Sequence, residues 1–127
     1  MTTKRKVTIG ISLAAGALLG ILLLMVLLEA LIGPRGVLSG FDRGIHARYE
    51  RITVGEARQA VIDALGAPNA KSDEFNLPQR HGFEHLFDAA ERSSSVEYYQ
   101  WINGTNWFYC IGFDSAGIVV IKGEGHS

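Results

Sequence analysis

The chain has 127 residues, 47% of them hydrophobic, and a formal net charge of −1. This length allows one modest domain. From residue 33 onward the chain carries nine Lys and Arg against twelve Asp and Glu, and an acidic balance without a basic stripe argues against a nucleic-acid partner. The single cysteine, Cys110, excludes an internal disulfide framework and a multi-cysteine metal site.

An uninterrupted apolar run follows the first few residues. Residues 7–28 contain no charged residue and no proline, and as a helix these 22 residues would rise about 33 Å, close to the ~30 Å hydrocarbon core of a bilayer. A cleaved secretory signal has an apolar region of roughly 7–15 residues and a small-x-small cleavage site, whereas this run ends in Leu28-Glu29-Ala30-Leu31-Ile32-Gly33. The sequence therefore predicts an uncleaved signal anchor over residues 7–32, with a cleaved signal peptide as the alternative.

Three basic residues precede the apolar run. Lys4, Arg5 and Lys6 favour a cytoplasmic location for residues 1–6, because positively charged flanks stay on the cytoplasmic side. The sequence thus predicts a single-pass protein of the cell (inner) membrane. Its C-terminal domain is expected outside the cytoplasm, in the periplasm or an equivalent space.

Small residues recur along the predicted membrane helix. Ser12, Gly16 and Gly20 are four apart and share one helical face. Small residues at this spacing let two helices approach closely, which predicts a helix–helix contact such as a homodimer. The alternative is that they have no special role, since glycine is common in membrane helices.

The stretch after the apolar run is rich in glycine. Gly33 and Pro34 are suited to end the membrane helix. Residues 33–48 are predicted as a linker, and a short helix over residues 45–52 leads into a domain predicted at residues 49–123.

The clearest local pattern is a capping box. The Thr53 side chain can cap the next helix, and Glu56, three residues later, can return the hydrogen bond. Apolar residues then recur at helical spacing, and Gly66 and Pro68 are placed to stop the helix. The sequence predicts a helix over residues 54–65.

Residues 69–95 give a weaker pattern, because they contain a proline, a glycine and many charges. One interpretation is a short helix over residues 81–92 that turns Phe83, Leu86 and Phe87 inward. The other is a long ordered loop.

The C-terminal third has the composition of β-strands. Residues 96–102, 106–113 and 118–122 are rich in aromatic and β-branched side chains. Asn103-Gly104 between the first two predicts a two-residue hairpin turn with positive φ at both positions, and residues 124–127 are predicted as a tail. Together these elements predict an α+β fold, in which a transmembrane helix precedes one or two helices packed on a three-stranded antiparallel β-meander.

The predicted sheet has apolar side chains on both faces. Strand alternation places Trp107, Tyr109, Ile111 and Phe113 on one face and Phe108 and Cys110 on the other, and it sets Tyr99 and Trp101 opposite Tyr98 and Ile102. One face is expected to pack on the helix over residues 54–65. The other is either covered by residues 69–95 or exposed as a surface for a protein partner. The candidate partner surface comprises Tyr98, Tyr99, Trp101, Trp107, Phe108 and Tyr109.

Few side chains suggest chemistry. His81, His85 and Asp88 would share a face on a helix and could then bind zinc, but the nearby proline and glycine favour a polar loop without a fixed geometry. Cys110 lies mid-strand between aromatic residues, which favours a buried inert thiol over a nucleophile. The sequence predicts no catalytic residue, cofactor or metal site, and a small metal-dependent enzyme is the least favoured hypothesis.

Two segments resemble the SmpA/OmlA (BamE-like) domain family. Ile52-Thr53-Val54-Gly55 and then Ala60-Val61-Ile62-Asp63-Ala64-Leu65-Gly66-Ala67-Pro68 are similar to the family's helix signature, and Ile111-Gly112-Phe113-Asp114-Ser115-Ala116-Gly117-Ile118-Val119 is similar to its final hairpin. The resemblance covers residues 49–123 and implies a helix pair on an antiparallel sheet that serves as a scaffold or binding module in the cell envelope. Envelope members of the family typically carry a lipidated N-terminal cysteine, and this chain carries an apolar helix instead.

These patterns predict a membrane-anchored, extracytoplasmic protein-binding or scaffold module of the cell envelope, without catalytic activity. Its expected partners are the membrane and envelope proteins. The alternative is a sensing domain in which the aromatic sheet face and residues 69–95 enclose a small molecule or a lipid.

Overall fold

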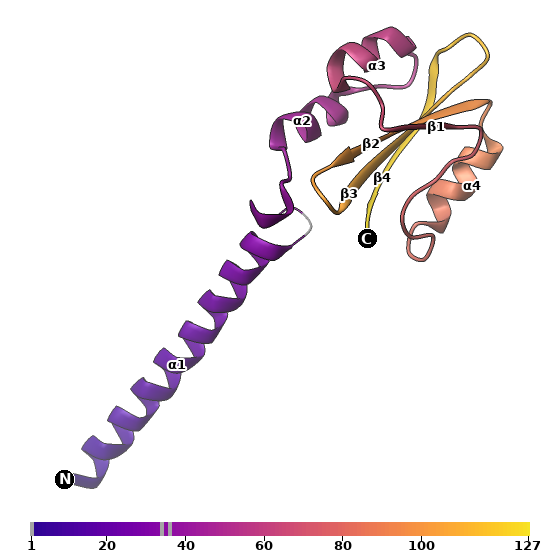
Figure 1. Cartoon of the computed structure of the whole chain (residues 1–127). Helices are drawn as coiled ribbons and strands as arrows, with labels where there is room; N and C mark the ends of the chain where they lie inside the picture. The colour runs from indigo at the N-terminus through magenta and orange to yellow at the C-terminus, as the bar shows by residue number, and fades with distance from the viewer. Residues whose placement is uncertain (1, 34, 36) are drawn as a thin grey trace.

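The structure, a computed structural model of the chain, describes residues 2–33, 35 and 37–127, with the side chains of residues 14–33, 35 and 38–127. Its first element, the helix α1 (Thr2–Ile32), projects away from the rest of the molecule (Figure 1). Within α1, Ala14–Ile32 has a mean hydropathy of 2.6 and is not buried against the domain. By length and composition α1 can therefore cross a membrane. The predicted role of Pro34 in ending this helix lies outside the described residues.

The remaining elements form an α+β domain, as predicted. They are a 3-10 turn η1 (Val37–Ser39), α2 (Arg43–Arg51), α3 (Arg58–Leu65), β1 (Ala70–Ser72), α4 (Glu84–Arg92), β2 (Glu97–Asn103), β3 (Trp107–Phe113) and β4 (Val119–His126). The strands form one antiparallel sheet in the order β1-β2-β3-β4. The expectation of three strands and one or two helices was slightly wrong. The unpredicted strand β1 has three exposed residues without a β-branched or aromatic side chain, so no local pattern marks it.

The domain begins earlier than predicted, because α2 lies largely within the expected linker. The Asp42 side chain caps α2 by accepting hydrogen bonds from the backbone N–H groups of Gly44 and Ile45, at 2.8 and 3.2 Å. His46 and Tyr49 of α2 are buried against the sheet. The predicted linker over residues 33–48 is therefore too long, since its second half belongs to the folded domain.

The helix α3 ends where predicted but begins later. Gly66, with φ of 82°, follows its last residue. The predicted capping box is absent, because the backbone around Gly55 and Glu56 bonds instead to the start of β4. Gly55 N donates to Val119 O and Val119 N donates to Glu56 O, both at 2.9 Å. This long-range pairing keeps residues 54–57 out of the helix, which starts at Arg58 without a side-chain cap.

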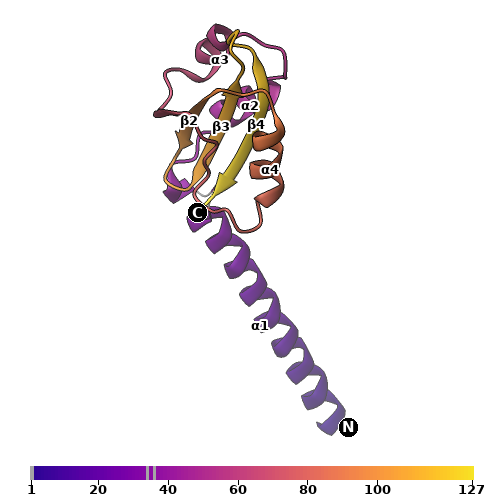
Figure 2. The same ribbon diagram turned by 90° about the vertical axis from the view of Figure 1, so that its right-hand side faces the viewer.

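Two hydrophobic cores lie on the two faces of the sheet. The helices α2 and α3 cover one face, where Tyr109, Ile111 and Phe113 are fully buried. Residues 75–92, which include α4, cover the other face, where Phe75 packs with Cys110. Figures 1 and 2 show α4 on the opposite side of the sheet from α2 and α3. Of the two interpretations of residues 69–95, the structure has a short helix that covers the sheet.

Two glycines of β4 let this cover approach closely. A Cβ atom on Gly123 would lie 2.9 Å from Phe75 Cζ, and one on Gly125 would lie 3.3 Å from Leu77 Cδ1. Both glycines belong to β4, which runs through His126. The predicted tail over residues 124–127 was wrong, because pairing with β3 extends the strand beyond the apolar residues that marked it.

The hairpin between β2 and β3 forms with a different turn from the one predicted. Asn103 is the last residue of β2, and of the turn residues Gly104 has positive φ. The Asn103 side chain is buried, where its Oδ1 accepts from Asp42 N at 2.7 Å and its Nδ2 donates to Asp42 O at 2.8 Å. This tie to the start of α2 places Asn103 in the sheet rather than at the turn.

Candidate functional site

The predicted aromatic partner surface is not a surface. Tyr98, Tyr99, Trp101, Trp107 and Tyr109 are each less than one-tenth exposed, and Phe108 is half-buried. The prediction was wrong because helices cover both faces of the sheet, so these side chains form the two cores. Sequence alternation assigned their faces correctly but carried no information about what covers each face.

The side chains considered for chemistry are scattered. His81 is fully exposed before the start of α4 and lies 3.6 Å from Glu84 Oε1, while His85 lies within α4. Among the described residues no three His, Cys, Asp or Glu side chains converge as a metal site. Cys110 is buried, and burial raises the pKa of its thiol to about 11, which disfavours the reactive thiolate.

The small residues of α1 face open space. A Cβ atom on Gly16 or on Gly20 would meet no other atom within 4 Å. The side chain of Ser12 lies outside the described part of the structure. The helix–helix contact stays a prediction.

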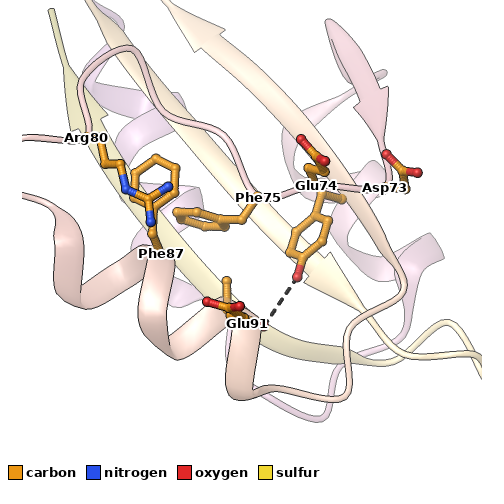
Figure 3. A pocket seen from close by; sticks show the side chains of 8 residues that line it. Asp73, Glu74, Phe75, Arg80, Phe87 and Glu91 are labelled. Carbon is orange, nitrogen blue, oxygen red and sulfur yellow. Dashed lines mark hydrogen bonds between the residues drawn. The ribbon is translucent and has the colours of Figure 1, made fainter.

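One depression of about 450 Å³ lies on the α4 side of the sheet, rimmed by acidic side chains. In Figure 3 the Arg80 guanidinium lies across the Phe87 ring, and the distance to the ring centroid is 4.7 Å. Phe75 meets Phe87 edge-on, with ring centroids 5.1 Å apart. The cation-binding face of this depression is thus already occupied by the chain's own Arg80.

A second depression, of about 440 Å³, runs along the free edge of β4 and is called the edge groove below. The edge strand forms its floor, the side of α2 forms one wall, and the start of α4 forms the other. Its lining residues are Arg35, Tyr49, Gly82, Phe83, His85, Leu86, Trp107, Lys122, Gly123, Glu124, Gly125 and His126.

The register of β4 shows which backbone groups face the edge groove. Ser127 N donates to Asn106 O at 3.2 Å, which makes this a hydrogen-bonded pair. Pairs alternate along an antiparallel ladder, so the neighbouring position His126, and then Glu124 and Lys122, direct their N–H and C=O groups away from β3. Within the described part of the chain these outward groups make no hydrogen bond. The edge groove therefore has an unpaired strand as its floor.

The α2 wall of the edge groove is held by cations and aromatic rings. Lys122 Nζ donates to the backbone oxygen of Tyr49 at 3.2 Å and lies 4.6 Å from the centroid of the Tyr49 ring. The Arg35 guanidinium lies 4.4 Å from the centroid of the Trp107 ring, and the His126 ring stacks on Trp107 at 5.3 Å. Arg35 follows the end of α1 by three residues, so this end of the groove is the one nearest to α1.

A buried polar network supports this wall from below. Asn103 Nδ2 donates to the Tyr109 hydroxyl at 3.1 Å, and this hydroxyl lies 2.7 Å from His46 Nδ1. Glu124 accepts a hydrogen bond from Trp107 Nε1 at 3.3 Å and lies 3.7 Å from His46. Burial raises the pKa of Tyr109 to about 12, so its hydroxyl stays protonated at neutral pH. The network fixes the position of Glu124 on the groove floor.

The sequence reasoning missed the edge groove. The signal that could have found it is the alternation Lys122-Gly123-Glu124-Gly125-His126, in which charged or polar residues alternate with glycines at the strand period of two. Glycines weaken a β pattern and suggested a tail instead.

Comparison of the chain with known protein families, with curated proteins and with solved structures gives no match. The resemblance to SmpA/OmlA domains stays a prediction.

Proposed function

We propose that the protein is a membrane-anchored binding module that holds an extended segment of a partner polypeptide along the edge groove, on the outer side of the membrane. The observation that carries this proposal is the outward-facing backbone of Lys122, Glu124 and His126, which has no hydrogen-bonding partner within the described chain. An extended peptide that adds to such an edge gains main-chain hydrogen bonds, and the flanking walls select its side chains.

The shape of the edge groove supports a strand as its occupant. Its floor is the edge of a sheet, and its walls rise from α2 on one side and from Phe83 and Leu86 on the other. A strand placed there would continue the sheet between the two covering layers. Both sheet faces are already filled by the chain's own side chains, so a ligand enclosed against the aromatic face is the less favoured alternative.

The membrane location and the orientation belong to the same proposal. The apolar helix α1 supports membrane anchoring, and Lys4, Arg5 and Lys6 before it support a cytoplasmic N-terminus. The domain would then face the periplasm or an equivalent compartment, where envelope proteins are the available partners. The role as an envelope scaffold also agrees with what the resemblance to SmpA/OmlA domains implies.

Photo-crosslinking of the full chain in its own membrane tests the binding function. A photoreactive amino acid replaces His85, on the wall of the edge groove, or Ser72, on the exposed strand β1 at the opposite edge. We expect a discrete adduct from position 85 and none from position 72. In the chain that carries the probe at position 85, Glu124→Pro should abolish the adduct, because proline removes one outward N–H.

Two controls separate strand addition from loss of folding. Lys71→Pro is the matched proline on the β1 edge, where Lys71 alone faces outward, and it should leave the adduct intact. Glu124→Gln keeps the backbone N–H and should also retain the adduct. An adduct that persists with Glu124→Pro in a folded domain would refute the proposal.

A further inference from the structure

The edge groove carries a charge pattern that specifies the side chains of its occupant. Resting on the proposed function, we infer that the bound segment has five successive residues of the order acidic, apolar, basic, apolar, acidic. The three charged positions face the α2 wall and the two apolar positions face the α4 wall.

Along the strand, the α2 wall presents the Lys122 cation, then the Glu124 carboxylate and then the His126 imidazole. Lys122, Glu124 and His126 lie on one face of β4, since they oppose Ile111, Tyr109 and Trp107 of the core on the α2 side. Arg35 adds a permanent cation at the His126 end, above the Trp107 ring.

The two cations lack carboxylate partners. Neither Lys122 nor Arg35 has a carboxylate oxygen within 4.0 Å among the described residues. Residues of an added strand that lie directly opposite Lys122, Glu124 and His126 are every second residue of that strand. Opposite charges give an acidic side chain opposite Lys122, a basic one opposite Glu124, and an acidic one at the His126 position, where Arg35 supplies the cation.

The α4 wall selects the two intervening residues. Gly123 and Gly125 present no side chain beyond the strand, and Phe83 and Leu86 stand beside them in the groove. The glycines themselves are buried under Phe75 and Leu77, so an apolar side chain of the added strand placed opposite each glycine would extend the apolar surface of this wall. The segment therefore alternates charge on one face with apolar residues on the other.

A second copy of the same chain does not fit this edge. Figure 2 shows β4 running toward the end of α1, so β4 points at the membrane. A two-fold pairing of β4 with itself is antiparallel and would turn the partner's α1 to the opposite end of the dimer. Both copies could then not enter one membrane, and the occupant is a different polypeptide.

Peptide binding to the full chain in nanodiscs of neutral lipid tests the charge pattern. The probe is a fluorescent peptide with the central sequence Glu-Val-Lys-Val-Glu, which reads identically in both directions. Its matched control, Lys-Val-Glu-Val-Lys, keeps the length, the valines and the β-propensity. We expect the first peptide to bind about tenfold more tightly, because three cross-strand charge pairs are reversed in the second.

Reversing the charges of the α2 wall should reverse the preference between the two peptides. The double variant Arg35→Glu, Lys122→Glu is expected to favour the control peptide, whereas Lys71→Glu on the β1 edge should leave the original preference unchanged. Equal affinity for the two peptides, or binding of neither, overturns the charge pattern. The proposed function would still stand if the crosslink at position 85 remains sensitive to Glu124→Pro, so the two failures are distinguishable.

Anionic lipid is the competing ligand for the two cations, because Arg35 lies near the membrane end of α1. A parallel measurement replaces half of the neutral lipid by phosphatidylglycerol. If peptide binding is retained, the cations serve the peptide. Its loss in anionic nanodiscs, restored by Arg35→Glu, would assign Arg35 to lipid headgroups and overturn the inference.

Discussion

The two edges of the sheet differ in length and in what lies beside them. β1 has three residues, all exposed, and a single outward-facing position, Lys71. β4 has eight residues, and its first part is closed by backbone bonds to Gly55 and Glu56. Natural sheets keep free edges short or charged to prevent unwanted pairing. β1 is protected by its short length. The remainder of β4 is longer and carries Lys122 and Glu124, and it stays open between two walls.

The β1 edge is therefore protected, whereas the β4 edge is available for pairing with an added strand. At β1 an added strand would find one outward residue, on a strand whose three residues are all exposed. At β4 it would find Lys122, Glu124 and His126 in succession, within the edge groove. An open edge becomes a specific site when neighbouring elements restrict which side chains can accompany the added strand.

Amide hydrogen exchange is expected to show the largest difference along β4. The N–H groups of Gly123 and Gly125 bond to β3, whereas those of Lys122 and Glu124 face the groove. After correction for intrinsic rates, the glycine amides should exchange about 10³-fold more slowly than the amides of Lys122 and Glu124, because their exchange requires a larger opening of the structure. The measurement is exchange with NMR detection on the full chain in micelles. Similar protection at all four amides would contradict the register.

Alkaline pH should destabilise the part of the sheet next to β4. Burial raises the pKa of Cys110, which opposes Gly123, from its ordinary value near 9 to about 11. Between these two pH values the Cys110 thiol keeps its proton in the folded state and releases it in the unfolded state. The contribution is complete below pH 9 and is lost as the pH rises to 11, a change of ~3 kcal/mol. Tyr109, with its pKa raised to about 12, extends the loss above pH 10.

Urea unfolding between pH 8 and pH 11 measures this effect. Cys110→Ala removes the thiol and should flatten the dependence between pH 9 and pH 10, below the range in which the tyrosines contribute. A variant that keeps the full slope would show that Cys110 is not its source.

A larger side chain on β4 should destabilise the domain more than a larger side chain on β1. A side chain at Gly123 would meet Phe75 and Leu86, at 2.9 and 3.3 Å from its Cβ. We expect Gly123→Val to lower the free energy of unfolding by roughly 1–3 kcal/mol through overpacking. The matched change Ala70→Val on exposed β1 should stay within about 0.5 kcal/mol. Equal urea midpoints for the two variants would refute the close packing behind β4.

The smallest expected effect comes from the two edge lysines. Lys122 Nζ donates to backbone oxygens of Tyr49 and Glu50, near the C-terminal end of α2. Lys122→Ala should therefore lower the free energy of unfolding by about 1 kcal/mol. Lys71 makes a cation–π contact with Tyr99 from an exposed position, so Lys71→Ala should change it by less than about 0.5 kcal/mol. Thermal unfolding of the two variants compares them directly. An equal loss of stability in both would contradict a structural role of Lys122.

Local patterns were informative where the structure of a segment depends on its own residues. The C-terminal stop of α3 at Gly66 was predicted because the ability of glycine to adopt positive φ is a local property. The inward positions Phe83, Leu86 and Phe87 were predicted from helical spacing, and they contact the second core. The predicted start of α3 was wrong because two backbone hydrogen bonds to Val119, far along the chain, keep residues 54–57 out of the helix.

The candidate site could not be predicted from the same patterns. The aromatic residues looked available because alternation shows that both faces of a sheet are apolar, without showing what covers them. The edge groove runs along residues 122–126, where Gly123 and Gly125 lack side chains and resembled a tail in the sequence. Only their pairing with Cys110 and Phe108 of β3 identifies them as strand residues.

The sequence by itself determined the apolar helix α1, since length and hydropathy are sums over neighbouring residues. It also determined the α+β class and the faces of the β2 and β3 side chains, because strand alternation is local. The tertiary structure decided the rest: the strand β1, the cover over both faces and the open edge at Lys122, Glu124 and His126. These depend on hydrogen bonds and packing between segments distant in the chain, which no local pattern encodes.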